Sequence, residues 1–245
     1  MRNMLKKNVL LAAGALLMSL SLPLRADVIY DNSNPANDLH YRFDTGTNEI
    51  GDEILLGGTA RYLTNFSFEY WGVSTGPNTN SFAGAVQAQV RFYEMDGPLH
   101  NGFNTPGTCF YDSGLFSVPS PTPRNTFVFT AGSDFLSGGL FIPTNDITWS
   151  VQFTGMGATD SLGVDIYCPP VVGTNYNDYW VNDPTGGWTL TENYSAPGAP
   201  YPGGPGQMNF GALMEGQIPE PSAMVLSLVG GLGIWGLTRR LRRKE

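Results

Sequence analysis

Residues 62–70 read YLTNFSFEY, a stretch in which aromatic and polar side chains alternate. The aromatic side chains stand at even positions, namely Tyr62, Phe66, Phe68 and Tyr70. Successive side chains of a β-strand point to opposite faces, so the other face carries the polar residues Asn65, Ser67 and Glu69. The pattern therefore predicts a strand with one face in the core and the other in water.

The same alternation recurs in three other stretches, at 86–92, 147–153 and 208–214. Shorter candidate strands lie at 28–30, 108–116, 126–129, 139–142 and 162–167. Residues typical of turns separate them, and none of these segments has the periodicity of an amphipathic helix. About nine short strands of this kind predict an all-β fold, an antiparallel β-sandwich of jelly-roll-like type, with a closed barrel as the alternative.

The composition of the 245 residues is that of one folded domain with appendages. Hydrophobic residues make up 41% and aromatic residues 12% of the chain, which is enough apolar surface for a packed core and argues against disorder. The two cysteines are too few for a disulfide-stapled mini-protein.

The first 26 residues have the three parts of a secretory signal peptide. Three basic residues lie among the first seven, an apolar run occupies 9–22, and the small residue Ala26 suits signal peptidase. We expect cleavage after Ala26, which makes Asp27 the first residue of the mature chain.

The other end of the chain, residues 219–245, predicts a membrane-spanning tail. Pro219, Glu220 and Pro221 precede a charge-free apolar stretch at 222–238. As a transmembrane helix this stretch would rise about 25 Å, slightly less than a hydrocarbon core of about 30 Å. A basic cluster follows it, made of Arg239, Arg240, Arg242, Arg243 and Lys244. By the positive-inside rule the cluster acts as a stop-transfer signal and stays in the cytoplasm, so residues 27–218 lie outside.

The terminal sequence IPEPSAMVLSLVGGLGIWGLTRRLRRKE resembles the PEP-CTERM sorting signal of Gram-negative bacteria. A Pro-Glu-Pro triplet, a short apolar helix and an arginine-rich end occur together and in that order. The resemblance implies that Pro219, Glu220 and Pro221 form the sorting motif, recognised by an exosortase, a membrane-embedded cysteine peptidase. It also implies an inner-membrane-anchored precursor with its body in the periplasm, which later reaches the cell surface or the extracellular matrix. Proteins with this tail are usually associated with extracellular polysaccharide, and some ice-binding proteins carry it.

Between these ends, residues 27–218 form the predicted extracytoplasmic domain, and this domain is strongly acidic. It has 19 Asp and Glu residues against four Arg and no Lys, a net charge of −15. A surface of this sign repels phosphate backbones, which excludes nucleic acid as a partner. It also repels acidic polysaccharide unless divalent cations bridge the two, while solubility outside the cell is the other explanation for the charge. Stretches such as NFSFEYWG and WSVQF resemble an extracellular domain often found ahead of such a tail, and this resemblance implies no site residues.

The sequence offers few residues for catalysis at neutral pH. His40 and His100 are the only histidines, and neither belongs to a metalloprotease, nucleophile-elbow or phosphate-binding motif. A Ser/His/Asp triad stays open, because its members need not be close in sequence. Four carboxylates are candidates for the acid–base pair of a glycoside hydrolase: Asp52, Glu53, Glu69 and Glu94.

A turn-rich stretch around residue 180 combines oxygen donors with aromatic rings. The donors suit calcium, although their spacing is not that of an EF-hand; they are Asn175, Asn177, Asp178, Asn182 and Asp183. The aromatic residues would either stack on sugar rings or pack in the core; they are Tyr179, Trp180 and Trp188.

Cys109 and Cys168 each lie near the end of a predicted strand. In an oxidising periplasm they would form a disulfide, and closing that loop would stabilise the fold by about 4 kcal/mol on the chain-entropy view. Two separate buried thiols are the alternative.

Three functions are compatible with the sequence. The first is a non-enzymatic surface or matrix protein, exported and sorted through its tail. The second is a carbohydrate-binding module that uses the aromatic residues near 180. The third is a polysaccharide-acting hydrolase, which needs a deep cleft lined by two carboxylates.

Overall fold

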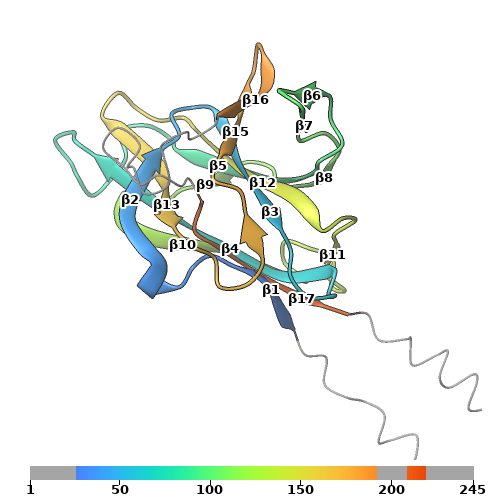
Figure 1. Ribbon diagram of the computed structural model, residues 1–245. Helices are drawn as coiled ribbons and strands as arrows, with labels where there is room; N and C mark the ends of the chain where they lie inside the picture. Colours follow the sequence, from blue (N-terminus) through green and yellow to red (C-terminus); the bar gives the residue numbers. More distant parts are fainter. Residues whose placement is uncertain (1–25, 192–208, 219–245) are drawn as a thin grey trace, which may run out of the picture. The chain divides into compact units, whose positions relative to one another are not determined.

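Strand β4 (Tyr62–Ser74) contains the alternating aromatic stretch and continues four residues beyond it. It lies inside a seven-stranded sheet in the computed structural model, which describes residues 26–191 and 209–218 (Figure 1). Phe66, Phe68 and Tyr70 are buried, and the polar residues between them are half-buried. The predicted division into a core face and an outer face is confirmed from Phe66 onward, whereas Tyr62 is not on the core face, because the alternation shifts and Leu63 is buried in its place.

The seven-stranded sheet is antiparallel and is built around β4. Along one edge of β4 lie β17 and then β13, and the full order is β1-β17-β4-β13-β2. The other edge of β4 pairs with β10 and β11. The remaining bounds are β1 (Asp27–Asp31), β2 (Asp38–Asp44), β10 (Thr122–Thr130), β11 (Leu140–Phe141), β13 (Asp160–Tyr167) and β17 (Ala212–Gln217).

The eight-stranded sheet is also antiparallel and has the order β16-β15-β3-β12-β5-β8, with β14 paired to β3 and β9 paired to β5. Its bounds are β3 (Glu49–Leu55), β5 (Gln87–Glu94), β8 (Cys109–Asp112), β9 (Phe116–Ser117), β12 (Asp146–Thr154), β14 (Thr174–Asn175), β15 (Tyr179–Asp183) and β16 (Gly187–Thr191). A separate hairpin joins β6 (Leu99–His100) to β7 (Phe103–Asn104). The single helical turn in the described ranges is the 3₁₀ turn Pro35–Asn37.

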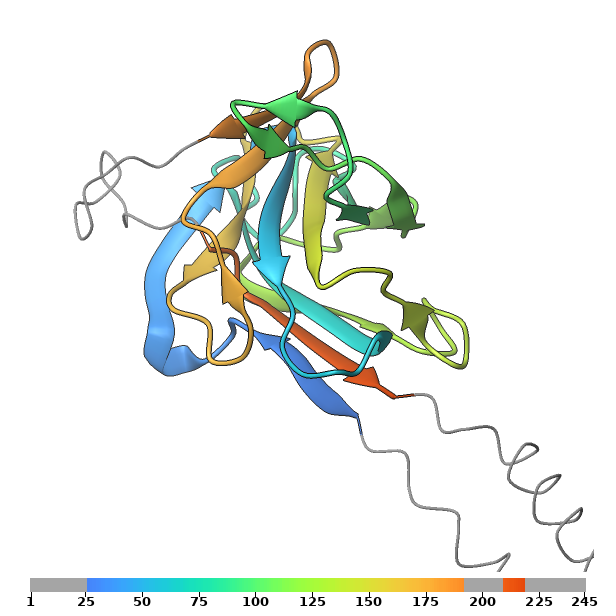
Figure 2. The same ribbon diagram turned by 45° about the vertical axis from the view of Figure 1, so that its right-hand side comes forward.

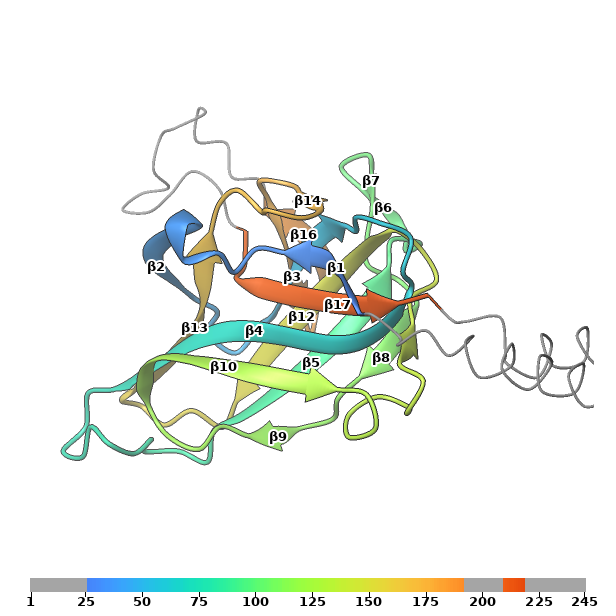
Figure 3. The same ribbon diagram turned by 90° about the horizontal axis from the view of Figure 1, so that it is seen from below.

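The two sheets pack face to face through one aromatic core. Phe66 of β4 meets Phe92 of β5 edge-on at 5.0 Å and Trp149 of β12 at 5.4 Å between ring centroids. Figure 3 shows β17, β4 and β10 in front of β12, β5 and β8, and Figure 2 shows the same layers from the side. The predicted all-β, antiparallel architecture is confirmed as two separate sheets, whereas the jelly-roll-like connectivity stays a prediction.

Most of the predicted strands are present, with shifted ends. The stretches 86–92 and 147–153 became β5 and β12, and the stretch 108–116 is divided between β8 and β9. Within 208–214, Phe210 forms an isolated bridge with Ile166 before β17 begins. The strands that alternation did not predict are β2, β3, β6, β7, β14, β15 and β16.

The first and last strands of the described chain are neighbours, since Asp27 of β1 stands opposite Gly216 of β17. Residues Ala26–Gln217 form one compact unit. No helix within 26–191 or 209–218 is long and apolar enough to cross a membrane. Outside the described residues lie the predicted signal peptide apart from Ala26, the Gly/Pro-rich stretch 196–206, and the tail 219–245 with its sorting motif, its apolar stretch 222–238 and its basic cluster.

Candidate functional site

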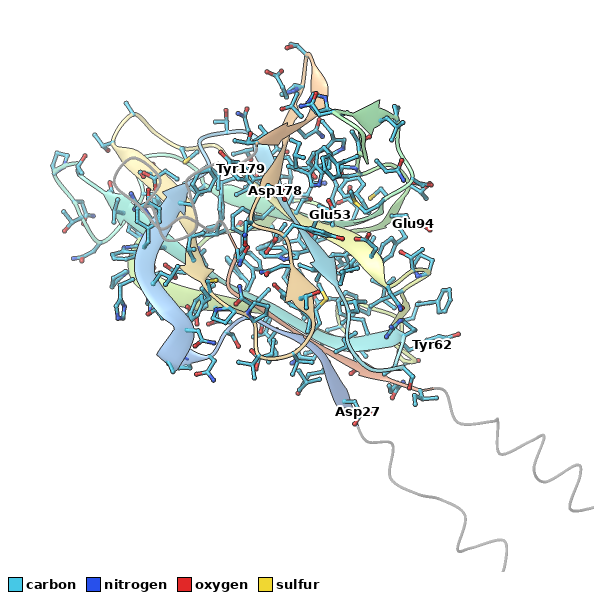
Figure 4. The ribbon with its side chains drawn as sticks, viewed as in Figure 1. Asp27, Glu53, Tyr62, Glu94, Asp178 and Tyr179 are labelled. Carbon is cyan, nitrogen blue, oxygen red and sulfur yellow. The ribbon has the colours of Figure 1, made fainter. Side chains whose placement is uncertain are left out.

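A cleft of about 500 Å³ opens on the outer face of the eight-stranded sheet. It lies where β3 and β5 end and β12 begins, and Figure 4 shows Glu53, Glu94 and Asp178 in this part of the molecule. Ile50 and Ile54 of β3 are in the core. Side chains alternate between the two faces of a strand, so Glu53, at an odd position, faces outward. The lining is Glu53, Glu94, Met95, Asp96, Leu99, Gly102, Phe103, Asn104, Thr144, Asp146, Tyr176, Asp178 and Leu190.

Two carboxyl groups meet on the floor of this cleft. Antiparallel register places Thr148 of β12 opposite Glu53 and Asp146 opposite Leu55, so Asp146 is the diagonal neighbour of Glu53 on the same face. The two side chains share a hydrogen bond, which requires a proton on one of them. Oδ1 of Asp146 is buried and has no hydrogen-bond partner among the described residues.

Glu53 holds a proton more tightly than an ordinary glutamate. Burial raises the pKa of Glu53 to about 7, and the negative charges of Asp146 and Asp178 act in the same direction. The indole Nε1 of Trp180 donates a 2.8 Å hydrogen bond to Oε2 of Glu53, which opposes the shift because it stabilises the carboxylate. Burial also raises the pKa of Asp146. Near neutral pH the floor therefore presents both a hydrogen-bond donor and several acceptors.

The β6–β7 hairpin forms an apolar wall of the cleft. Its two-residue turn is Asn101-Gly102, with φ of 53° and 93°, a left-handed pair that asparagine and glycine adopt at low cost. The turn leaves two apolar side chains in solvent: Leu99 is 70% exposed and Phe103 is 54% exposed. Exposed apolar side chains beside a cleft are a common feature of binding sites.

The segment between β14 and β15 supplies another wall. Tyr176 and Asp178 come from this connection, and the Tyr176 ring is exposed. Burial raises the pKa of Tyr176, and the charges of Asp146, Glu53 and Asp178, which line the same cleft, raise it further. The arrangement combines polar acceptors, one ionisable proton and apolar surface, which is the chemistry needed to hold a hydroxyl-rich ligand.

No family model, curated protein or solved structure matches this chain. The function of the cleft is therefore inferred from the chemistry of the side chains that line it. Some of the site residues predicted from the sequence line the cleft, and the other predicted site residues lie elsewhere.

Two of the four carboxylates predicted as an acid–base pair line the cleft, and two do not. Glu53 and Glu94 both face it. Asp52 points into the core and accepts a 2.9 Å hydrogen bond from the backbone N–H of Phe210. Glu69 lies on the other sheet and accepts a 2.6 Å hydrogen bond from the Tyr167 hydroxyl. A pair that includes Asp52 or Glu69 is therefore ruled out by their positions.

Most of the aromatic residues considered for stacking on sugars are buried in the fold. Trp180 is completely buried, and its indole is committed to Glu53. Tyr179 is in the core and packs edge-on against Phe43 at 4.9 Å. Direct sugar contact by Tyr179 or Trp180 is thus wrong for this structure, because neither ring is accessible. Trp188 is half-buried against Tyr93 at 5.3 Å, and its contact with carbohydrate stays a prediction.

The predicted calcium donors do not converge. Asn175 donates to the Tyr30 hydroxyl at 3.1 Å, Asn182 donates to Glu49 at 3.0 Å, and Asp183 accepts hydrogen bonds from Thr185 in its own turn. Of these residues only Asp178 lines the cleft, and Asn177 is exposed. Within 26–191 and 209–218 no group of three or more His, Cys, Asp or Glu side chains is arranged to hold a metal ion.

The predicted disulfide between Cys109 and Cys168 is not formed. Cys109 lies in β8 of the eight-stranded sheet, where its thiol donates to the Tyr111 carbonyl at 3.1 Å. Cys168 follows β13 of the other sheet and interacts with the side chain of Asn209. The two thiols do not meet because β8 and β13 belong to different sheets.

Neither histidine lines the cleft. His40 is exposed on β2 with its Nδ1 2.8 Å from Asp38, and His100 is in the β6–β7 hairpin. The cleft residues that sequence reasoning missed are Asp146, Asp96, Leu99, Phe103 and Tyr176. The sequence could have indicated Asp146, because it directly precedes the strongly alternating stretch 147–153 and so stands at the start of a predicted strand.

Proposed function

We propose that this chain is an exported, non-enzymatic matrix protein that holds an extracellular polysaccharide in the cleft on its eight-stranded sheet. The observation that carries the ligand assignment is the juxtaposition of the Glu53–Asp146 carboxyl pair with the exposed apolar hairpin. Carboxyl oxygens accept hydrogen bonds from sugar hydroxyls, while the C–H faces of a sugar ring pack on apolar side chains such as Leu99 and Phe103.

The export part of the proposal rests on the sequence at the two ends. A signal peptide at 1–26 directs secretion, and the tail 219–245 anchors the precursor in the inner membrane until an exosortase acts at Pro219, Glu220 and Pro221. The net charge of −15 on residues 27–218 favours a neutral polysaccharide over an acidic one, because like charges repel.

The sorting claim is tested in the producing cells. Glu220→Ala and deletion of 219–245 should each change the fractionation and the processed size of the protein. A matched substitution at Glu215, whose carboxylate accepts from Asn65 within the fold, should leave sorting unchanged. Unchanged location and processing of both tail variants would refute the sorting claim.

The ligand claim is tested by retention on polysaccharide purified from the extracellular matrix of the same cells, with cellulose and carboxymethyl cellulose as a neutral and acidic pair. Phe103→Ala and Leu99→Ala should each weaken retention several-fold. Leu115→Ala is the matched control, since Leu115 is exposed to the same degree as Phe103 but does not line the cleft. Equal retention of the hairpin variants and the control would remove the cleft as the binding site.

A second candidate function, a polysaccharide hydrolase, is favoured by one observation. The pKa of Glu53 is raised to about 7, which is suited to a general acid, and Glu94 lines the same cleft. Glu53→Gln separates the two functions by their products, because a binding protein releases no sugar in either form, whatever the substitution does to retention. Reducing-sugar release by the native chain that Glu53→Gln abolishes would establish the hydrolase instead.

A further inference from the structure

An apolar patch surrounds the point where the described chain ends after β17. It consists of Tyr62, Leu136 and Phe141, here called the exit patch. Leu136 is 81% exposed and Phe141 is 53% exposed. The rings of Tyr62 and Phe141 lie 5.3 Å apart. None of the three side chains carries a charge, on a domain whose net charge is −15.

Strand pairing and one side-chain hydrogen bond hold the exit patch together. Phe141 of β11 and Gln217 of β17 both stand opposite Tyr62, on the two edges of β4. Gln217 also donates a 3.0 Å hydrogen bond from Nε2 to the carbonyl of Gly138, in the loop that carries Leu136. The start of β4 lies between β17 and β11 (Figure 1), and Figure 4 shows Tyr62 at this end of the domain.

The exit patch faces away from the core. Leu63 is in the core and Leu140 packs against it, so their neighbours Tyr62 and Phe141 point to the outer face of the seven-stranded sheet. The cleft belongs to the outer face of the eight-stranded sheet, although its lining residue Thr144 follows Phe141 by only three positions.

The chain beyond Gln217 limits what this patch can meet. The charge-free stretch 222–238 begins five residues after Gln217, and five residues reach at most about 18 Å even when fully extended. If that stretch spans a bilayer, as the proposed function has it, the end of β17 stays within about 18 Å of the hydrocarbon, close enough for the patch to reach the interface. Aromatic and aliphatic side chains are favoured at that depth, where one end of the ring is apolar and the other is wet.

We propose that the exit patch is a lipid-contact surface, which rests on the bilayer interface while the tail is attached. The partner is the interfacial region of a bilayer, contacted through apolar packing rather than charge. This inference depends on the proposed membrane tail, but it makes a separate claim about the orientation of the folded domain.

The test uses the full chain in vesicles of zwitterionic phosphatidylcholine brominated on its acyl chains near the headgroup, which quenches nearby tryptophan. Trp235 lies within 222–238 and would dominate the signal, so the background is Trp235→Phe. On this background Phe141→Trp should be quenched strongly. Phe103→Trp, on the cleft hairpin and equally exposed, is the matched control and should be quenched no more than the background.

The outcomes separate the two claims. Co-flotation of the chain with the vesicles, together with quenching of Trp235 in the native sequence, reports the membrane tail. Co-flotation with equal quenching at positions 141 and 103 overturns the exit patch and leaves the tail standing. Absence of co-flotation refutes the tail, and the exit patch falls with it because no bilayer is held close to the end of β17. Leu136→Trp gives a second reading in the same assay if Phe141→Trp proves unstable.

Discussion

The indole Nε1 of Trp180 donates a 2.8 Å hydrogen bond to Oε2 of Glu53, and this bond joins a fully buried ring to the floor of an open cleft. Trp180 stands opposite Gly51 on the neighbouring strand, on the same face as Glu53. The sequence left two roles open for Trp180, stacking on a sugar ring or packing in the core, and the ring is buried. Its position makes it a support for the carboxyl group.

Trp180→Phe should raise the pKa of Glu53 further above about 7. The bond from the indole stabilises the carboxylate, so its loss makes the charged form less favourable. The substitution should also destabilise the fold by about 1–3 kcal/mol through the unpaired buried carboxyl and the lost ring volume. Titration of the Glu53 carboxyl carbon by NMR checks the first claim. A lower pKa in the variant would show that the bond does not act in this way.

The stability of the domain should fall as pH rises from about 4.5 to about 7. In that window the native state keeps the proton on Glu53 that the unfolded chain has already released. The native state binds more protons, so the free energy of unfolding decreases with pH. Because Glu53 is partly exposed and screened by solvent, its share is about 1–3 kcal/mol.

Glu53→Gln should flatten this slope, since glutamine keeps an acceptor for Trp180 and a donor for Asp146 but does not titrate. Asp165 lies on the other sheet, and burial raises its pKa to about 7 as well, so part of the slope should remain until Asp165→Asn is added. Urea midpoints measured at pH 5 and pH 8 for the four combinations check the assignment. An unchanged slope in Glu53→Gln would contradict it.

Gly163→Ala should destabilise the domain by more than about 2 kcal/mol. A Cβ at this position of β13 would lie 2.1 Å from the carbonyl oxygen of Phe43 on the paired strand, and backbone atoms cannot yield without breaking the ladder. Gly138→Ala is the control, because nothing lies within 4 Å of its Cβ position, and it should change stability by no more than about 0.5 kcal/mol. Comparable thermal midpoints for the two variants would mean that β2 and β13 are farther apart than described.

The strands that the sequence predicted best are those whose burial is periodic. β4, β5 and β12 place aromatic or branched residues on their core face at every second position, and polar residues occupy the other face even in β12, where Thr148 and Ser150 are also buried. β3 was missed although it is central. Its core face carries Asp52 between Ile50 and Ile54, so the expected apolar alternation is broken at its middle.

Only part of the cleft could be predicted from the sequence, for a different reason. Glu53 and Glu94 were named as carboxylates with no indication of their neighbours. Asp146 reaches Glu53 only through the register of β12 against β3, a pairing of segments about 90 residues apart that composition does not encode. The acidic and aromatic residues near 180 read as one binding cluster, but the β15–β16 hairpin distributes them between core, turn and cleft wall.

Asp52, which interrupts the apolar alternation of β3, leads to a further prediction about the core. Its side chain is completely buried, Oδ2 accepts from the Phe210 N–H at 2.9 Å, and Oδ1 has no hydrogen-bond partner among the described residues. Burial raises the pKa of Asp52 well above its ordinary value of 3.8. Keeping this carboxyl group in the core therefore costs stability that increases with pH, while the group holds the backbone that leads into β17.

Asp52→Asn should keep the acceptor for Phe210 and remove the charge, so it should be at least as stable as the native chain at pH 7, with an advantage that grows as pH rises from 4 to 8. Asp52→Leu, the apolar isostere, should instead lose about 1–3 kcal/mol at every pH, because it leaves the Phe210 N–H buried without a partner. Urea midpoints for the three chains at pH 4 and pH 8 distinguish these effects. If the leucine variant is the most stable of the three at both pH values, the hydrogen bond to Phe210 contributes nothing, and the polar residue in the centre of β3 has no structural role.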